Sequence, residues 1–203
     1  MNLKGLYLII TNPIIGYQKL TEIAVSCDVS IIQLRIKNNN EDKLNIANDI
    51  KNITNGTKTR FIINDDINLA IEVDADGVHL GQDDMDIKSA RNILGFSKII
   101  GISASNEWDI KKAIKDGCDY LGIGPVFATT TKKEKVPLGI DTLKSLTRDI
   151  SIPWFAIGGI KEENIYLLKE NNISKIAIIS DLINSENPKE KAIMIINSLT
   201  DEN

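Results

Sequence analysis

Charged and amide side chains follow several short apolar runs of this sequence, each at the point where the run ends. Gln33, Arg35 and Lys37 close one run, Asn64 closes the next, and Ser103 closes a later one. Arginine binds phosphate as a planar fork and lysine binds it as a point charge, whereas amides both donate and accept hydrogen bonds. These residue types predict a site for a phosphorylated substrate that carries a polar heterocycle.

Two carboxylates, Asp65 and Asp84, follow neighbouring strands of the expected sheet. Hard oxygen ligands, few in number, suit a Mg²⁺ ion that keeps several waters and is completed by substrate phosphates. The alternative is that both residues are helix N-caps, and for either residue alone that is the better interpretation. Asp66 and Asp86 can supply those caps, which leaves Asp65 and Asp84 for a metal.

A second anion site is predicted in the C-terminal part of the chain. Gly158 and Gly159 follow one apolar run, and Ile179 and Ser180 follow the next. In (β/α)8 barrels the loops after the last two strands often bind one phosphate through backbone N–H groups and a helix N-terminus. A pair of tight turns is the alternative, and the coincidence of both loops favours phosphate.

Other candidate residues are less specific. Lys37 and Lys132 taken alone are typical of surface charges, whereas Arg35 interrupts an apolar run where no solvated face is expected. The single histidine, His79, lies inside an apolar run and points either into a barrel or out to a helix. A hydrogen-bonded core histidine is the favoured interpretation. Trp108 and Trp154 are interpreted as packing residues.

The elements that position these residues alternate along the whole chain. Strand-like runs are rich in Ile, Val, Leu and Phe without alternation, which is typical of strands buried on both faces. We expect strands over residues 3–10, 30–35, 60–64, 76–80, 98–103, 119–124, 153–158 and 174–179. We expect helices over residues 17–26, 40–54, 66–73, 86–94, 106–116, 140–148, 161–171 and 188–199.

Eight such pairs predict a (β/α)8 TIM barrel that forms a single domain over residues 1–203, with all strand C-terminal ends on one face. An open doubly wound sheet is the alternative fold. It needs a glycine-rich turn after the first strand, where Thr11-Asn12-Pro13 stands instead. The polar loop over residues 128–138 is the long connection and predicts a lid or binding loop.

Composition excludes several classes of partner. The 203-residue chain carries a formal net charge of −4 at pH 7, which argues against nucleic acid. No apolar stretch approaches the roughly 20 residues needed to cross a bilayer, so we expect no membrane partner. We expect a cytoplasmic protein, because a signal-peptide pattern is absent and Cys27 and Cys118 are too few for a disulfide framework. Small molecules are the expected partners, and the sequence leaves a homo-oligomer open.

Several of these strand ends together resemble one family. The strings QLRIK, FIINDDINLAIEVDADGVHLGQDD, GISAS, DYLGIGPVFATTTKK, IPWFAIGGI and AIIS occur in the order and spacing of thiamine-phosphate synthases. The resemblance covers nearly the whole chain, from the second expected strand to the eighth. It is specific because seven separate strand ends agree.

The resemblance implies an activity and a role for each matching residue. The family joins 4-amino-2-methyl-5-pyrimidinylmethyl diphosphate to 4-methyl-5-(2-phosphoethyl)thiazole, giving thiamine phosphate and diphosphate. Residues implied for the pyrimidine diphosphate are Gln33, Arg35, Lys37, Asn64, Ser103 and Lys132, of which Lys132, Arg35 and Ser103 take the catalytic roles. Asp65 and Asp84 are implied as ligands of Mg²⁺. Residues implied for the thiazole phosphate are Thr129, Thr131, Gly159, Ile179 and Ser180.

The chain departs from the family pattern at three places. Ser105 and Asn106 stand where a histidine often follows the strand-five serine, and Thr11-Asn12-Pro13 stands where an aspartate often follows the first strand. Asp181 stands beside the expected thiazole-phosphate site, where the family usually has alanine. An acid at that place weakens phosphate binding unless its side chain points away or caps the helix.

Two other functions compete with the synthase. A thiazole tautomerase has the same barrel, tends to lose the diphosphate-binding lysine and the metal acids, and uses a histidine as acid and base. A non-catalytic barrel that binds thiazole or thiamine phosphates needs no clamp for diphosphate. The presence of Lys132, Asp65 and Asp84 favours the synthase over both.

Overall fold

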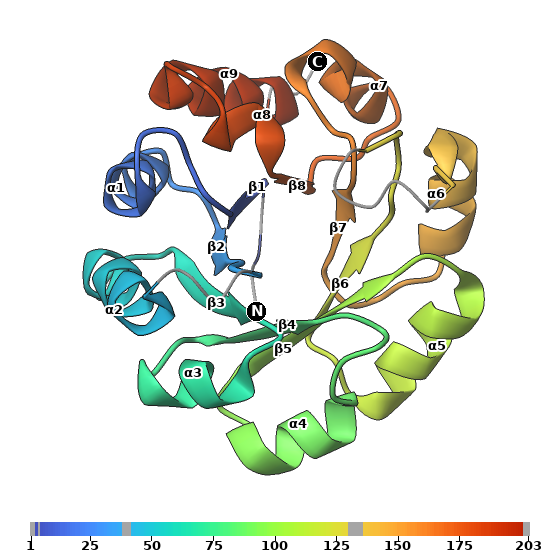
Figure 1. The fold of residues 1–203 in the computed structure, drawn as a ribbon. Helices are drawn as coiled ribbons and strands as arrows, with labels where there is room; N and C mark the ends of the chain where they lie inside the picture. Colours follow the sequence, from blue (N-terminus) through green and yellow to red (C-terminus); the bar gives the residue numbers. More distant parts are fainter. Residues whose placement is uncertain (1–2, 4, 38–41, 130–135, 201–203) are drawn as a thin grey trace.

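Eight short apolar runs form the strands of a closed parallel barrel in this computed structural model (Figure 1). The structure describes residues 3, 5–37, 42–129 and 136–200. Within this part of the chain the strands are β1 (Leu6–Ile10), β2 (Ile31–Leu34), β3 (Arg60–Asn64), β4 (Gly77–Leu80), β5 (Ile99–Ala104), β6 (Tyr120–Ile123), β7 (Trp154–Ile157) and β8 (Ile176–Ile178). Each pairs with the next in sequence order, and β8 closes the barrel on β1.

Helices surround the barrel and connect one strand to the next (Figure 1). They are α1 (Tyr17–Ser26), α2 (Lys43–Thr54), α3 (Ile67–Glu72), α4 (Ile87–Leu94), α5 (Glu107–Asp116) and α6 (Gly139–Thr147). A short 3-10 helix, η1 (Glu162–Asn164), leads into α7 (Ile165–Lys169), and α8 (Ser180–Ile183) follows β8 before α9 (Pro188–Thr200). Among the described residues, none of these helices has the length and apolar character needed to span a membrane.

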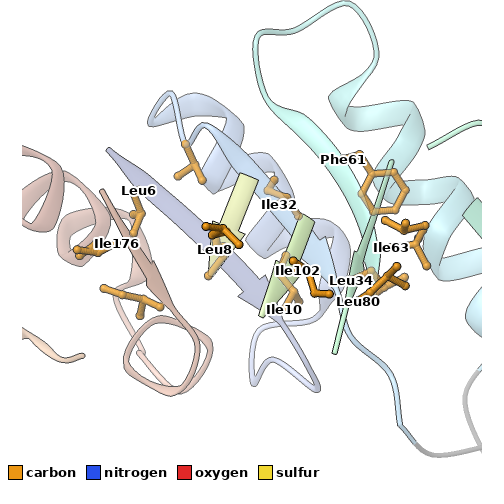
Figure 2. Packing of buried hydrophobic residues seen from close by; sticks show 14 of the residues in the cluster. Leu6, Leu8, Ile10, Ile32, Leu34, Phe61, Ile63, Leu80, Ile102 and Ile176 are labelled. Atoms are coloured by element: carbon orange, nitrogen blue, oxygen red, sulfur yellow. The ribbon is translucent and has the colours of Figure 1, made fainter. Parts of the chain in front are cut away.

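Strand side chains alternate between two buried layers. On β1, Leu6, Leu8 and Ile10 belong to the outer layer between strands and helices, which Figure 2 shows with residues of neighbouring strands. Tyr7 and Ile9 belong to the inner layer, inside the barrel. Burial on both faces explains why the strands are continuous apolar runs, as the sequence predicts.

The expected TIM barrel is confirmed, and the alternative of an open sheet is wrong because β1 pairs with both β2 and β8. The expected strand over 3–10 begins only at Leu6, since Gly5 has a φ of 66° that ends the extended backbone. At the other end of the chain, Pro188 begins α9 as predicted. Proline suits this position because the first turn of a helix needs no backbone N–H donor from it.

Three expectations about the elements need correction. Residues 161–171 do not form one helix, because η1 and α7 have different backbone geometry. Helix α8 is absent from the expected elements, because its four residues are too few for a periodic pattern. Trp108 is 67% exposed, because Ile110 forms the buried face of α5, whereas Trp154 is half-buried against the outer layer as expected.

Candidate active site

A pocket opens at the carboxyl ends of the strands. Predicted site residues that line it are Gln33, Arg35, Asn64, Ser103, Thr129 and Ile179. Gly158, which the sequence predicts for the second anion site together with Gly159, lines it as well. His79 and Pro125 line it too, although the sequence pattern does not mark them as ligand contacts. Predicted residues that are not part of its lining are Lys37, Asp65, Asp84, Gly159 and Ser180. The barrel therefore brings the predicted strand ends together, while the roles of these residues with a ligand stay predictions.

Arg35 stands at the pocket wall directly after β2. Its backbone N–H donates to the carbonyl of Ile10 at 2.9 Å, which fixes the chain where the strand ends. Among the described residues its guanidinium forms no ion pair, in contrast to Arg60 and Arg91, which pair with aspartates. A guanidinium with no carboxylate partner at a pocket wall is suited to an anionic ligand.

Asp65 and Asp84 approach each other beside the pocket. Lys37 Nζ lies 3.0 Å from Oδ2 of Asp65, and the backbone N–H of Gly81 donates to Oδ2 of Asp84 at 2.7 Å. Burial raises the pKa of the Asp84 carboxyl above its ordinary value, and the adjacent Asp65 carboxyl raises it further. Two carboxylates this close repel each other, and a divalent cation would relieve the repulsion.

The helix caps next to these acids are supplied by other residues, as the sequence predicts. Asp66 accepts from the backbone N–H of Leu69 at 3.0 Å and caps α3. Asp86 accepts from the backbone N–H of Ser89 at 3.0 Å and caps α4. Capping therefore does not explain Asp65 or Asp84.

The acid pair fits one particular kind of metal site. In the described part of the chain, no three His, Cys, Asp or Glu side chains gather to enclose an ion. Two carboxylates alone leave most positions around an ion open. That donor set suits Mg²⁺ with water and substrate phosphate as its other ligands, as expected from the sequence, and does not suit a closed structural metal site.

His79 points into the barrel and lines the pocket, which settles its orientation. Its Nδ1 lies 2.9 Å from the Tyr120 hydroxyl, and its Nε2 lies 2.9 Å from Oγ of Ser103. The interpretation as a hydrogen-bonded core histidine is confirmed, but it is incomplete because His79 also forms part of the pocket wall. Whether His79 points into the barrel depends on how β4 pairs with its neighbours, and His79 pairs with Gly101 of β5. The sequence of a single strand does not reveal this register.

The loops after β6 and β7 lie against each other at the opposite side of the pocket. Gly158 and Gly159 have φ values of 98° and 65°, in the region that favours glycine. A Cβ at Gly158 would stand 2.5 Å from the Cα of Pro125, and one at Gly159 would stand 2.3 Å from the Ala128 carbonyl oxygen. Both glycines are therefore required by close backbone approach, which keeps this wall next to Thr129.

Asp181, beside the predicted phosphate site, has a backbone N–H and a lysine as its partners. Its Oδ2 accepts from the backbone N–H of Glu162 at 3.0 Å, at the start of η1. Its Oδ1 lies 3.2 Å from Nζ of Lys191, which also lies 3.5 Å from Oε2 of Glu162. From the sequence, an acid at this place weakens phosphate binding unless its side chain points away or caps the helix. Asp181 caps another helix, η1, and is paired with a lysine.

Two of the predicted residues, Thr131 and Lys132, lie outside the described residues, as does most of the loop over 128–138. Thr129, which precedes them, lines the pocket. Their predicted contacts with phosphate and diphosphate stay predictions.

Comparison with known proteins gives one consistent family. The family model for thiamine monophosphate synthase matches residues 6–182. A thiamine-phosphate synthase of Prochlorococcus marinus (strain AS9601) is 53% identical over 186 residues, covering 91% of this chain and 53% of that relative. One of Clostridium tetani is 41% identical over 189 residues, covering 91% of this chain and 90% of that relative. The chain spans about half the length of the first of these curated relatives and most of the second.

A solved structure agrees with these relatives. Thiamine phosphate pyrophosphorylase from Pyrococcus furiosus superposes with a TM-score of 0.87 at 29% identity, covering 98% of both chains. The 3-hexulose-6-phosphate synthase of Salmonella typhimurium superposes with a TM-score of 0.75 at 15% identity, a likeness of fold alone.

Proposed function

This chain belongs to the thiamine monophosphate synthase family, and we propose that it joins 4-amino-2-methyl-5-pyrimidinylmethyl diphosphate to 4-methyl-5-(2-phosphoethyl)thiazole, forming thiamine phosphate and diphosphate. The observation that carries this proposal is a single pocket whose wall runs from Arg35 and Asn64 to Thr129 and Ile179. One such pocket can hold two substrates with their reacting atoms facing each other.

The reaction requires no strong acid or base from the protein. The bond between the pyrimidine methylene carbon and the diphosphate oxygen breaks, and its electron pair leaves on the diphosphate. The thiazole nitrogen forms the new bond to that carbon with its own lone pair. The described pocket lining accordingly includes no carboxylate and no cysteine. The protein aligns the substrates, neutralises the leaving group and excludes water.

The pyrimidine diphosphate is assigned to the β2–β5 side of the pocket. Arg35, Lys37 and Lys132 neutralise the departing diphosphate, because developing negative charge is stabilised most by fixed cations. Gln33 and Asn64 bind the heterocycle through their amides. Ser103 lies beside the reacting ring. The support for these roles is the family resemblance together with the shared pocket wall of Gln33, Arg35, Asn64 and Ser103.

Mg²⁺ is the metal that we assign to Asp65 and Asp84. When bound there it would offset the charge of the diphosphate and hold its oxygens. The two carboxylates supply the protein ligands, and Lys37 at 3.0 Å from Asp65 adds a cation at the same edge.

The thiazole phosphate is assigned to the β6–β8 side, with Thr129, Thr131, Gly159, Ile179 and Ser180. The support is the left-handed turn at Gly158 and Gly159 and the start of α8 at Ser180, directly after β8. The charge of Asp181 beside this place is offset by Lys191, which lies 3.2 Å from it and also 3.5 Å from Glu162.

We also assign the protein to the cytoplasm. Its two cysteines, Cys27 and Cys118, are both free thiols in the structure. Free thiols persist in a reducing compartment.

A coupling assay tests the proposed function. Purified protein is incubated with both substrates, first with Mg²⁺ and then with EDTA, and thiamine phosphate is quantified. We expect product only with the metal. Product without the metal would refute the role of Asp65 and Asp84. Isomerisation of the thiazole phosphate alone would indicate a tautomerase, and binding without turnover would indicate a non-catalytic barrel.

A further inference from the structure

A chain of hydrogen bonds crosses the inside of the barrel and joins two residues of the pocket wall, Gln33 and Ser103. The amide nitrogen of Gln33 donates to the Tyr7 hydroxyl, which lies 2.9 Å from the Tyr120 hydroxyl. The Tyr120 hydroxyl lies 2.9 Å from Nδ1 of His79, and Nε2 of His79 lies 2.9 Å from Oγ of Ser103. Gln33 and Ser103 line the pocket, whereas the two tyrosines are fully buried beneath it.

We propose that Tyr7 and Tyr120 are positioning residues, which fix the proton of His79 on Nε2 and thereby make Ser103 a hydrogen-bond donor toward the ligand. A phenol has one proton, so it can donate only once. Gln33 donates to Tyr7, so the one proton of Tyr7 has the Tyr120 oxygen as its acceptor among the partners that the structure shows. Tyr120 has then accepted from Tyr7, and its own proton goes to Nδ1 of His79. The ring then carries its proton on Nε2 and donates to Oγ of Ser103.

Ser103 is the group that gains from this order. Its Oγ accepts from His79, so its own proton is available for an acceptor atom of a ligand in the pocket. In the reverse order Ser103 would donate to His79 and would offer a ligand only lone pairs. The site therefore fits a heterocycle or leaving group that presents an acceptor at Ser103. This inference deepens the proposed function. Its kinetic test depends on that function, whereas its spectroscopic test does not.

The surroundings of the two phenols keep the chain neutral. Burial raises the pKa of both Tyr7 and Tyr120 above the ordinary value of a tyrosine. Their rings pack edge to face, with centroids 5.9 Å apart, and both also contact Phe155. Rings held in this way cannot swing to other partners, so the packing keeps the same groups in hydrogen-bond contact.

Two glycines of the barrel strands leave room for the side chains that form this series of hydrogen bonds. A Cβ at Gly101 on β5 would stand 2.0 Å from Cζ of Tyr120, inside the ring's own volume. A Cβ at Gly122 on β6 would stand 3.3 Å from Cε1 of His79. The glycines at positions 101 and 122 therefore give the inner layer the space that the Tyr120 ring and its contact with His79 need.

A spectroscopic experiment tests the tautomer without any substrate. His79 is the one histidine of the sequence, so ¹⁵N-histidine labelling gives the signals of a single imidazole. In the wild type we expect a protonated Nε2 and an unprotonated Nδ1. In Tyr120→Phe, which keeps the ring but removes the donor, we expect the proton to distribute over both nitrogens. A wild-type proton on Nδ1, or identical spectra of the two proteins, would overturn the proposal.

A double-mutant cycle tests the effect on Ser103. We expect Tyr120→Phe to lower kcat roughly two- to tenfold, as the loss of one hydrogen bond allows, with KM for the pyrimidine diphosphate changed less. In the background of Ser103→Ala the same substitution should have no further effect, because Tyr120 acts through Ser103. Additive effects would indicate a merely structural role and would reject the proposal.

Two further variants complete the kinetic experiment. Tyr166→Phe removes a hydroxyl from an exposed tyrosine of α7 and should leave kcat unchanged. Tyr7→Phe breaks the series of hydrogen bonds one step further from Ser103 and should also lower kcat. It replaces Tyr120→Phe in the test if that variant folds poorly. If the wild type makes no thiamine phosphate, the proposed function fails while the ¹⁵N experiment still decides the tautomer.

Discussion

Carboxylates at two places on the barrel rim have opposite surroundings. Asp65 and Asp84, after β3 and β4, lie against each other, and the pKa of Asp84 is raised by burial and by that neighbour. Asp181, after β8, accepts from a backbone N–H and pairs with Lys191 at 3.2 Å. The three residues are of one type and follow strands of one barrel. Asp65 also pairs with Lys37, but it lies against a second carboxyl group, whereas Asp181 lies against a lysine and a backbone N–H.

The difference shows that partners, and not residue type, decide what a rim carboxylate can do. A carboxylate with a lysine and a backbone donor is already satisfied and contributes to the fold. Two carboxylates that repel each other cost stability, and such arrangements cluster at functional sites. The acid pair is therefore expected to hold a cation, and Asp181 is expected to hold η1 against α9.

The largest effect is expected from Asp84→Asn. This substitution keeps an oxygen for the N–H of Gly81 but removes one charge from the pair. We expect kcat/KM for coupling to fall about 100-fold or more, as for other lost electrostatic groups at a reacting centre. The thermal midpoint should stay equal or rise, because the repulsion is gone. Activity within tenfold of the wild type would contradict the comparison.

Adding or removing Mg²⁺ should change the thermal stability through the Asp65–Asp84 pair and not through Asp181. Mg²⁺ together with inorganic diphosphate, each far above its dissociation constant, should stabilise the wild type by about 2–3 kcal/mol. Differential scanning fluorimetry should show this as a rise of several degrees for a chain of this size. The rise should be lost in Asp84→Asn and kept in Asp181→Asn. An equal rise in all three proteins would place the metal elsewhere.

Lys191→Met should make Asp181 resemble the acid pair. The lysine side chain is 24% exposed, and its loss leaves Asp181 with the Glu162 N–H as its remaining hydrogen-bond partner among the described residues. We expect KM for the thiazole phosphate to rise roughly two- to fivefold, since an uncompensated charge nearby costs about 1 kcal/mol. Steady-state kinetics in low salt measures this, and an unchanged KM would separate Asp181 from the phosphate site.

A smaller effect is expected from alkaline pH. Burial alone would lower the pKa of Lys191, but the neighbouring Asp181 and Glu162 outweigh it and the pKa is raised. A raised lysine pKa stabilises the fold below the ordinary value near 10.5 and loses that contribution as pH rises above it. Urea unfolding between about pH 9.5 and 11.5 should show a steeper loss for the wild type than for Lys191→Met. Parallel curves would contradict this.

The smallest effect is expected from Asp181→Asn. The amide oxygen can still accept from the Glu162 N–H, and the place beside the predicted phosphate becomes neutral. We expect kcat/KM within about threefold of the wild type and a loss of stability of at most about 1 kcal/mol, as for other partly exposed pairs. A tenfold loss of activity would mean that Asp181 has a direct role in the site.

The convergence of the site could be predicted from the sequence, for a physical reason. Apolar runs mark buried parallel strands, and all strand C-terminal ends of a barrel share one face, so the sequence alone places Arg35, Asn64 and Ser103 together. The pairing of Asp181 could not be predicted, because it depends on Lys191 on another helix. The hydrogen-bond chain through His79 could not be predicted for a similar reason, since Tyr7 and Tyr120 are 113 residues apart in the sequence.

The close fit between Gly101 and Tyr120 has a consequence for how such chains diverge. Any side chain at position 101 collides with the tyrosine ring, because even its first carbon would stand 2.0 Å from Cζ. Shrinking position 120 first opens a void that costs roughly 3–5 kcal/mol, as truncation of large core aromatics does. Neither single step is neutral, so we expect the two positions to co-vary among relatives, with glycine at one wherever the other is aromatic.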